Sequence, residues 1–222
     1  MNKKAVCVLS GGMDSTLATF MAKVELGFEI IPVHFNYGQL TQDRELKAFR
    51  DICKALNLTV KYEIDLPFFS QIGASALTDD SLEIPTNGIE DGVPITYVPF
   101  RNGIFLSIAT AIAEKEEASA IFIGVVQEDS SGYPDCTDTF IDKIQSAMNQ
   151  GTKETTNIEI ITPLVHLTKE QIVAKAMKLN VPLELTWSCY KNSTKACGVC
   201  DSCRLRLKGF NNIGQIDKIE YV

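Results

Sequence analysis

The sequence predicts an α/β fold, a Rossmann-like parallel sheet with helices on both faces, followed by a small cysteine-rich C-terminal segment. Three observations support this prediction. Short β-rich runs alternate with longer helical patterns along most of the 222 residues, which is typical of parallel sheets covered by helices. A glycine turn, Ser10-Gly11-Gly12, joins the first strand to the first helix. Four cysteines crowd into residues 189–203.

The individual elements follow from the periodicity of apolar residues. Strands are expected at residues 5–9, 30–35, 60–64, 120–125 and 158–161, and helices at 15–26, 43–56, 103–117 and 169–179. The segment 67–99 does not fit this rhythm, because it is rich in Ser, Thr, Asp and Gly, and we expect a long loop or lid beside the functional site. The predicted domains are 1–181 and a C-terminal region, 182–222.

Composition indicates an ordinary soluble globular protein. Hydrophobic residues make up 45% of the chain and charged residues 22%, and no apolar run approaches the roughly 20 residues of a membrane span. The N-terminal apolar run ends at the glycine turn, so it is interpreted as a strand and not a signal peptide, and a cytoplasmic location is expected. A net charge of −7 disfavours non-specific binding to nucleic acid. We expect no direct nucleic-acid or membrane partner, and a homodimer is left open.

The glycine turn carries the strongest chemical signal, in the run Ser10-Gly11-Gly12-Met13-Asp14-Ser15. Glycine permits positive φ and lets main-chain N–H groups approach a phosphate. Ser15 or Asp14 is expected to cap the helix, whose first turn offers N–H donors and a positive dipole end to an anion. Asp14 cannot lie bare against phosphate, so a Mg²⁺ between them is expected. The alternative is a glycine turn with a purely structural role.

The C-terminal cysteines have the spacing of a metal site. Cys189, Cys197, Cys200 and Cys203 follow the pattern C-x7-C-x2-C-x2-C, and each C-x2-C places two thiolates on one tight turn. Four thiolates around Zn²⁺ make a closed tetrahedral site with a structural role. An iron–sulfur cluster is the alternative, although no Cys-Pro follows and the fourth ligand lies upstream.

The remaining cysteines and the histidines give weaker signals. Cys7 and Cys53 are predicted to be buried hydrophobes, and Cys136 to be structural and not a nucleophile. His34 ends the second predicted strand, where a structural role and a ligand contact are equally compatible with the pattern. His166 is predicted to be a loop residue and has no assignable role.

Residues 10–15 resemble the SGGxDS signature of the PP-loop ATP pyrophosphatases, which have an adenine nucleotide alpha hydrolase-like fold and release the β- and γ-phosphates together. Four later segments extend the resemblance: YVPFRN at 97–102, SGYPDC at 131–136, WSCY at 187–190 and CGVCDSCRLR at 197–206. In this order they resemble the 7-cyano-7-deazaguanine synthase family of queuosine biosynthesis. One departure is Phe100, where many members of that family carry Gly before Arg-Asn.

The resemblance implies an ATP-dependent ligase that converts 7-carboxy-7-deazaguanine and ammonia to 7-cyano-7-deazaguanine. Adenylation of the carboxylate lets ammonia displace AMP to give the amide, and adenylation of the amide oxygen then lets AMP leave to give the nitrile. Both steps convert a poor oxygen leaving group into a phosphate ester and release pyrophosphate. The cofactors it implies are one structural Zn²⁺ per chain, with ATP and Mg²⁺ as substrate.

The resemblance also implies roles for particular residues. ATP is expected to contact Leu9, Ser10, Gly11, Gly12, Met13, Asp14, Ser15 and Thr16, with Asp14, Ser15 and Arg101 as catalytic residues. Arg101, Asn102, Tyr133 and Asp135 are expected to bind the substrate. Asp135 matches the N1–H and amine of a guanine-like ring, Tyr133 is expected to stack on that ring, and Lys169 either reaches phosphate or lies on the surface.

Two other functions fit parts of the sequence. A PP-loop tRNA sulfur transferase uses the same ATP chemistry, with Cys136 and a tail cysteine as its catalytic pair, but the acidic net charge argues against it. A non-enzymatic nucleotide-binding module with a metal-stabilised tail predicts ATP binding without release of pyrophosphate.

Overall fold

A computed structural model, which describes residues 3–88, 92–127 and 132–222, contains a five-stranded sheet in the order β3-β2-β1-β4-β5. The strands are β1 (Lys4–Val8), β2 (Glu29–Asn36), β3 (Tyr62–Asp65), β4 (Ala120–Ile123) and β5 (Glu159–Ile161). Every neighbouring pair is parallel. The predicted fold class is therefore confirmed.

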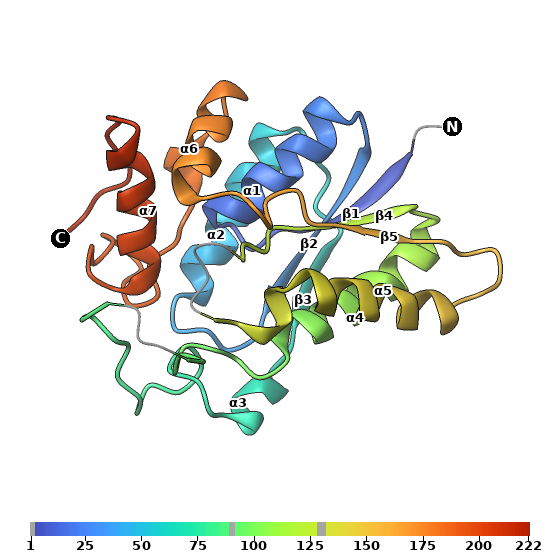
Figure 1. Ribbon diagram of the computed structural model, residues 1–222, viewed down its shortest axis with the longest axis horizontal. Helices are drawn as coiled ribbons and strands as arrows, with labels where there is room; N and C mark the ends of the chain where they lie inside the picture. The colour runs from blue at the N-terminus through green and yellow to red at the C-terminus, as the bar shows by residue number, and fades with distance from the viewer. Residues whose placement is uncertain (1–2, 89–91, 128–131) are drawn as a thin grey trace.

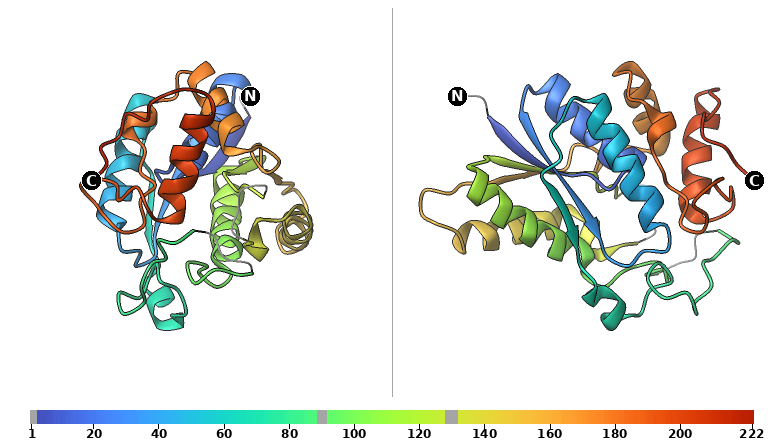
Figure 2. Two further views of the ribbon diagram at one scale, coloured as in Figure 1. Left: turned by 60° about the vertical axis from the view of Figure 1, so that its left-hand side comes forward. Right: turned by 180° about the vertical axis from the view of Figure 1, so that it is seen from behind.

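Helices cover both faces of this sheet (Figures 1 and 2). The helices are α1 (Met13–Phe20), α2 (Gln42–Ala55), α3 (Phe68–Ile72), α4 (Arg101–Glu116), α5 (Asp138–Gln150), α6 (Lys169–Lys178) and α7 (Asp201–Asn212). A π-helical turn, η1 (Met21–Glu25), extends α1, and 3₁₀ turns occupy η2 (Pro134–Cys136) and η3 (Leu183–Leu185). Helices α1, α2, α6 and α7 lie on one face, and α4 and α5 lie on the other (Figure 2).

The two central strands, β1 and β4, are apolar except for Lys4 at the start of β1, because both of their faces are covered. Side chains of a strand alternate between faces, so Val6 and Ile121 pack toward α4, whereas Cys7 and Phe122 pack on the opposite side. All residues of β4 are buried. A parallel sheet buried on both faces is expected to have such continuous hydrophobic strands.

The structure adds three α-helices that the sequence analysis did not list, namely α3, α5 and α7. The apolar side chains of α5 (Phe140, Ile141, Ile144 and Met148) pack on the sheet at helical spacing, although only Ile141 is fully buried. Helix α3 is a five-residue turn inside the predicted loop 67–99. Elsewhere in the described part of that loop, the amide of Ala76 donates to Ile95 O and Leu77 O accepts from the amide of Leu40.

The C-terminal region shares a hydrophobic core with the sheet domain. Leu183, Trp187 and Phe210 belong to the same buried cluster as Leu17 on α1 and Phe49 on α2. The division at residue 182 stays a prediction, and this shared core means that the two parts are packed together.

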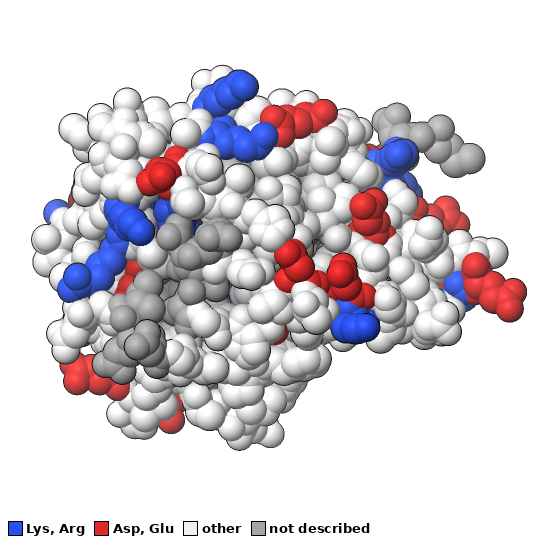
Figure 3. All heavy atoms as spheres, viewed as in Figure 1, with Lys and Arg blue, Asp and Glu red and all other residues white. Residues whose placement is uncertain are grey.

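The visible surface carries both signs of charge. Acidic and basic side chains are interspersed over the face in Figure 3. Within the described residues, every helix is too short or too polar to cross a lipid bilayer.

Candidate active site

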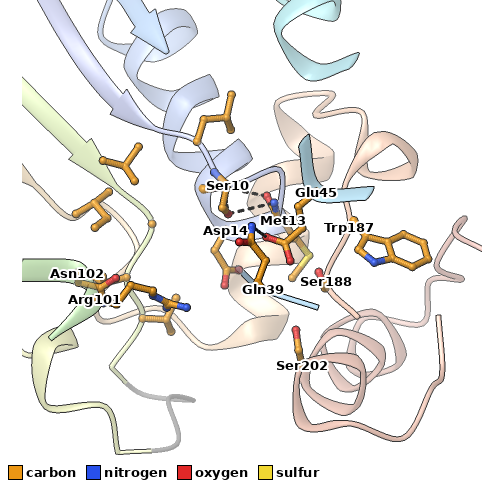
Figure 4. Close-up of a pocket in the computed structure, with 18 of the residues that line it drawn as sticks. Ser10, Met13, Asp14, Gln39, Glu45, Arg101, Asn102, Trp187, Ser188 and Ser202 are labelled. Atoms are coloured by element: carbon orange, nitrogen blue, oxygen red, sulfur yellow. Dashed lines mark hydrogen bonds between the residues drawn. The ribbon is translucent and has the colours of Figure 1, made fainter. Parts of the chain in front are cut away.

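A cavity of about 260 Å³ opens at the carboxyl edge of the sheet, where β1 and β4 end. The chain leaves β1 toward β2 on one side and reaches β4 on the other, so this is the topological switch point of the sheet. Ligands of open α/β sheets bind in the crevice at such a point. The walls come from the turn after β1, the segment after β2, the start of α4 and the C-terminal region (Figure 4).

The turn after β1 needs glycine for two separate reasons at Gly11. Its φ is +89°, which L side chains rarely adopt, and a Cβ there would lie 2.6 Å from Glu45 O on α2. The carbonyl of Gly11 also accepts from the amide of Trp187 at 2.9 Å, which ties the C-terminal region to this turn.

Hydroxyl groups hold the turn and leave the helix end open. Ser10 Oγ and Ser15 Oγ lie 2.9 Å apart, and Ser10 Oγ also accepts from the amide of Gly12 at 3.3 Å. The prediction that Asp14 or Ser15 caps α1 is wrong, because Gly12 occupies the N-cap position. Both residues lie instead in the first turn of α1, whose amides remain available to an anion.

The predicted ATP-binding residues divide into cavity walls and supports. Leu9, Ser10, Gly12, Met13, Asp14 and Ser15 line the cavity. Thr16 is fully buried, and its hydroxyl donates to Gly12 O at 2.7 Å. Gly11 and Thr16 therefore shape the turn from behind.

Asp14 forms an ion pair across 155 residues of sequence, with Lys169 Nζ 2.6 Å from Asp14 Oδ2. Lys169 is 8% exposed, so it is not a surface lysine. The other carboxylate oxygen, Oδ1, is buried and meets no donor among the described residues. A buried carboxylate oxygen without a hydrogen-bond donor is a suitable ligand for a divalent cation.

Arg101 begins α4 and points its guanidinium at the cavity, as expected from the sequence. Its Nη1 donates to Tyr37 Oη at 3.0 Å, and the guanidinium carbon lies 5.3 Å from the centre of the Tyr37 ring. Its Nε is buried and reaches no acceptor in the described part of the chain. A buried cation with an unused donor suits an anionic ligand.

Asn102 connects α4 to the loop before α5. Its backbone amide donates to Asp135 Oδ2 at 2.9 Å, and its Nδ2 contacts Cys136 Sγ at 3.3 Å. Asp135 is only 3% exposed, and burial raises the pKa of its carboxyl. Tyr133 and Cys136, on either side of it, line the cavity, as does Asn102. Ser131, part of the same predicted segment, lies outside the described residues.

Phe100, where the family pattern has glycine, has a left-handed backbone. Its φ is +54°, a value that glycine adopts without cost and other residues rarely do. The ring packs edge-on against Phe140 at 5.8 Å and covers Gly103, where a Cβ would meet it at 2.4 Å. The contacts of the Phe100 ring therefore help to hold the strained backbone directly before Arg101.

Gly124, directly after β4, supports the phosphate-binding turn and was missed in the sequence analysis. A Cβ at this position would lie 2.6 Å from the amide nitrogen of Ser15 and 2.7 Å from the carbonyl carbon of Asp14. Only tertiary packing brings these residues together, so no local motif marks Gly124.

We expect Gly124→Ala to displace the start of α1 and lower pyrophosphate release by about 10²-fold, because small misplacements of reacting groups have effects of that size. Steady-state pyrophosphate release with ATP and the acid substrate measures it. Gly151→Ala, where the added Cβ makes ordinary contacts at 3.5 Å or more, is the control. Equal activity of both variants would contradict this role.

The four C-terminal cysteines converge on one point. The sulfur atoms of Cys189, Cys197, Cys200 and Cys203 all lie within 4.8 Å of one another. Cys189 Sγ accepts from the amides of Lys191, Asn192 and Cys197 at 3.3–3.4 Å. Amide donors stabilise thiolates, so the donor set fits a metal ion.

The remaining cysteines and histidines have structural surroundings. Cys7 and Cys53 are buried, as predicted, and burial raises the pKa of each thiol to about 12. Burial also raises the pKa of Cys136 to about 12, which does not favour a nucleophile. His34 is buried and bonds Leu9 O and Asn36 Oδ1, both at 3.1 Å.

The fold and the site together define a PP-loop ATP pyrophosphatase. A family model described as "Queuosine biosynthesis protein QueC" matches residues 4–214. The chain belongs to this family.

Relatives cover nearly the whole chain. The 7-cyano-7-deazaguanine synthase of Aliarcobacter butzleri (strain RM4018) is 72% identical over 219 residues, which covers 99% of this chain and 96% of that protein. The protein of the same name from Nautilia profundicola is 69% identical over 219 residues, with 99% and 98% covered.

A solved structure with low sequence identity has the same fold. The crystal structure titled as a predicted subunit of tRNA methyltransferase from Methanocaldococcus jannaschii is 16% identical, with a TM-score of 0.52. The match covers all of this chain and 93% of that one. At this identity the likeness concerns the fold alone.

Proposed function

We propose that this protein is a 7-cyano-7-deazaguanine synthase, which converts 7-carboxy-7-deazaguanine and ammonia to the nitrile with two ATP. The carboxylate is adenylated and ammonia displaces AMP, and the resulting amide is then adenylated on oxygen and loses AMP. The observation that carries this proposal is the convergence of the phosphate loop, Asp14 and Arg101 on one cavity in a chain of this family.

The phosphate loop and Asp14 bind the triphosphate in this proposal. First-turn amides of α1 and the hydroxyls of Ser10 and Ser15 contact the β- and γ-phosphates. Asp14 Oδ1 would hold the Mg²⁺ that accompanies ATP, and that ion would supply positive charge near the departing pyrophosphate. Lys169, on the other oxygen of Asp14, adds a second positive charge at the same place.

Arg101, Asn102 and Tyr133 bind the acid substrate. The unused Nε donor of Arg101 faces either the substrate carboxylate or the α-phosphate, both of which carry negative charge in the first adenylation. Tyr133, whose hydroxyl lies 2.9 Å from Thr96 Oγ1, presents its ring to the cavity for stacking on the deazaguanine.

In this proposal the four-cysteine cluster would hold one structural zinc ion. Four thiolates would complete its coordination and leave no position for water or substrate, so the ion would take no part in the chemistry. The cluster contributes to activity indirectly. It holds Cys189 in place, and the neighbouring residues Trp187, Ser188 and Tyr190 line the cavity.

Asp135→Asn tests the assignment of Asp135 to the deazaguanine ring. The side-chain oxygen of the new asparagine can still accept from the backbone amide of Asn102. An NH2 group, which donates, takes the place of Oδ1, the oxygen that the Cys136 thiol approaches only to 4.0 Å. An unpaired polar contact costs about 1–3 kcal/mol, so we expect about tenfold to a hundredfold weaker binding of the acid and unchanged binding of ATP.

Titration calorimetry with each ligand measures both affinities, and Asp138→Asn, an exposed change nearby, is the control. If ATP affinity falls and acid affinity does not, Asp135 does not bind the ring.

Incubation with 7-carboxy-7-deazaguanine, ammonium and Mg-ATP tests the proposed function. We expect mass spectrometry to detect the nitrile, together with AMP and pyrophosphate. ATP binding without pyrophosphate release would instead support a non-enzymatic nucleotide-binding module.

The sulfur-transferase alternative makes a separate prediction, namely a persulfide on Cys136. The buried, high-pKa environment of that thiol and the match to 7-cyano-7-deazaguanine synthases along the whole chain both argue against it.

A further inference from the structure

The proposed reaction, on which this inference rests, requires the removal of protons from nitrogen. Adenylation turns the substrate oxygen into a leaving group. Ammonium, however, must lose a proton before its nitrogen has a lone pair that can attack the carbon. The amide must later lose both of its N–H protons to become a nitrile. A group that accepts these protons has to face the same cavity as the reacting carbon.

Few side chains around the cavity are suited to that task. The titratable groups that line it are Asp14, Tyr37, Glu45, Arg101, Tyr133, Cys136, Lys169, Tyr190 and Arg206. Lysine and arginine side chains are cations. Burial raises the pKa of Tyr37 and of Cys136 to about 12, and Tyr133 and burial raise that of Tyr190. Asp14 is paired with Lys169. Among the described residues that line the cavity, Glu45 is the remaining carboxylate.

Glu45 is held in a fixed position on the first turn of α2. Its Oε1 accepts from Thr41 Oγ1 at 2.7 Å, and its Oε2 accepts from Gln39 Nε2 at 3.3 Å. Gln39 is itself anchored, because its Oε1 accepts from the amide of Tyr37 at 2.8 Å. Figure 4 shows Glu45 and Gln39 close to Ser10 at the cavity wall.

The electrostatic surroundings give Glu45 the proton affinity of a base that works near neutral pH. Burial raises the pKa of its carboxyl to about 7, while hydrogen bonds from Thr41 and Gln39 and the charge of Arg101 lower it. A general base is most effective when its pKa lies close to the working pH. The side chain is half-buried, so it can still exchange protons with solvent through the cavity.

We propose that Glu45 is the general base of the reaction, accepting protons first from ammonium and then from the amide nitrogen. In the amination, an N–H bond of ammonium breaks toward Glu45, and the freed pair forms the C–N bond. Glu45 passes this proton to solvent and accepts a second one from the nitrogen as the C–O pair leaves with AMP, which gives the neutral amide. In nitrile formation, the last N–H proton passes to Glu45. Its bonding pair becomes the third C–N bond, and AMP leaves again with the C–O pair.

Glu45→Gln tests this role, because glutamine keeps the shape and one acceptor oxygen for Gln39, and its amide can donate to the Thr41 hydroxyl, but it cannot accept a proton. Supplying the amide and Mg-ATP without ammonium isolates nitrile formation from the titration of ammonium. We expect nitrile formation to fall by about 10²–10⁴-fold, the usual contribution of a general base. Pyrophosphate release from the acid substrate without ammonium requires no proton from nitrogen and should change by less than about threefold.

The pH dependence gives a second test that a structural role would not affect. Only the ionised carboxylate accepts a proton, so the wild-type rate from the amide should rise as the pH passes about 7. Thr41→Val removes a hydrogen-bond donor that stabilises the ionised carboxylate. The pKa of Glu45 should therefore rise, and the increase in rate should move to higher pH. The residual rate of the Glu45→Gln variant should not show this increase with pH.

Asp43→Asn, a change at an exposed carboxylate on the same helix, is the matched control and should behave as wild type. If Glu45→Gln lowers pyrophosphate release from the acid as much as nitrile formation, Glu45 binds metal or phosphate and is not the base. An unchanged nitrile rate would also overturn the proposal. Wild-type protein that makes no nitrile from acid or amide would instead contradict the proposed function, and the role of Glu45 with it.

Discussion

Asp14→Asn should lower pyrophosphate release by about 10²–10³-fold while the protein stays folded. Preorganised charge around a developing anion contributes effects of that size, and Asp14 is proposed to hold the cation that neutralises pyrophosphate. The substitution retains the size of the side chain but removes the negative charge from Oδ1, which meets no other donor in the described structure. Single-turnover release of pyrophosphate from Mg-ATP and the acid measures the loss.

Glu25→Gln provides a matched control for Asp14→Asn. It removes the pair between Lys175 Nζ and Glu25, 3.0 Å apart, which links η1 to α6 just as Asp14 and Lys169 link α1 to α6. If the loss reflected only the docking of α6, both variants would lose activity equally. Near-normal turnover of Asp14→Asn at saturating Mg²⁺ would contradict the phosphate-loop assignment.

Cys200→Ala should release one zinc per chain and loosen the region after residue 182. Four thiolates would hold the ion, and metal binding adds directly to the folding free energy of the segment that carries them. The protein should be colourless as purified, with zinc close to one per chain by elemental analysis. Limited proteolysis of the variant should cleave after residue 182 and leave the sheet domain intact, which also tests the predicted domain boundary.

Activity of Cys200→Ala should fall as well, although the metal has no chemical role. Trp187 lies two residues before Cys189 and its amide bonds Gly11 O, so disorder in the tail reaches the phosphate loop. Cys53→Ala, which removes a buried thiol outside the cluster, should retain zinc and is the control. Stoichiometric iron with broad visible absorbance, or zinc retained by Cys200→Ala, would contradict the zinc assignment.

Local sequence patterns predicted the parts of the fold and site that depend on short stretches of chain. The apolar runs at residues 5–9 and 120–125 predicted the two central strands, because a strand buried on both faces needs little else. The phosphate loop and the cysteine cluster have fixed spacings within a few residues. Each was therefore readable without knowledge of the tertiary structure.

The parts that sequence reasoning missed depend on contacts between distant segments. Lys169 meets Asp14 across 155 residues, and nothing near either residue marks the pair. Gly124 is required by the backbone of Asp14 and Ser15, and Glu45 becomes a cavity residue only because α2 packs against the turn at Gly11. Helix α5 is an exception, because Phe140, Ile141, Ile144 and Met148 recur at helical spacing and could have indicated it.

The ratio of pyrophosphate released to nitrile formed tests the central claim most directly. Two successive adenylations, of the carboxylate and of the amide, predict a ratio of two when the acid, ammonium and Mg-ATP are supplied. The same protein given the amide should show a ratio of one. A ratio of one from the acid, or pyrophosphate release that ends at the amide without nitrile, would contradict the account.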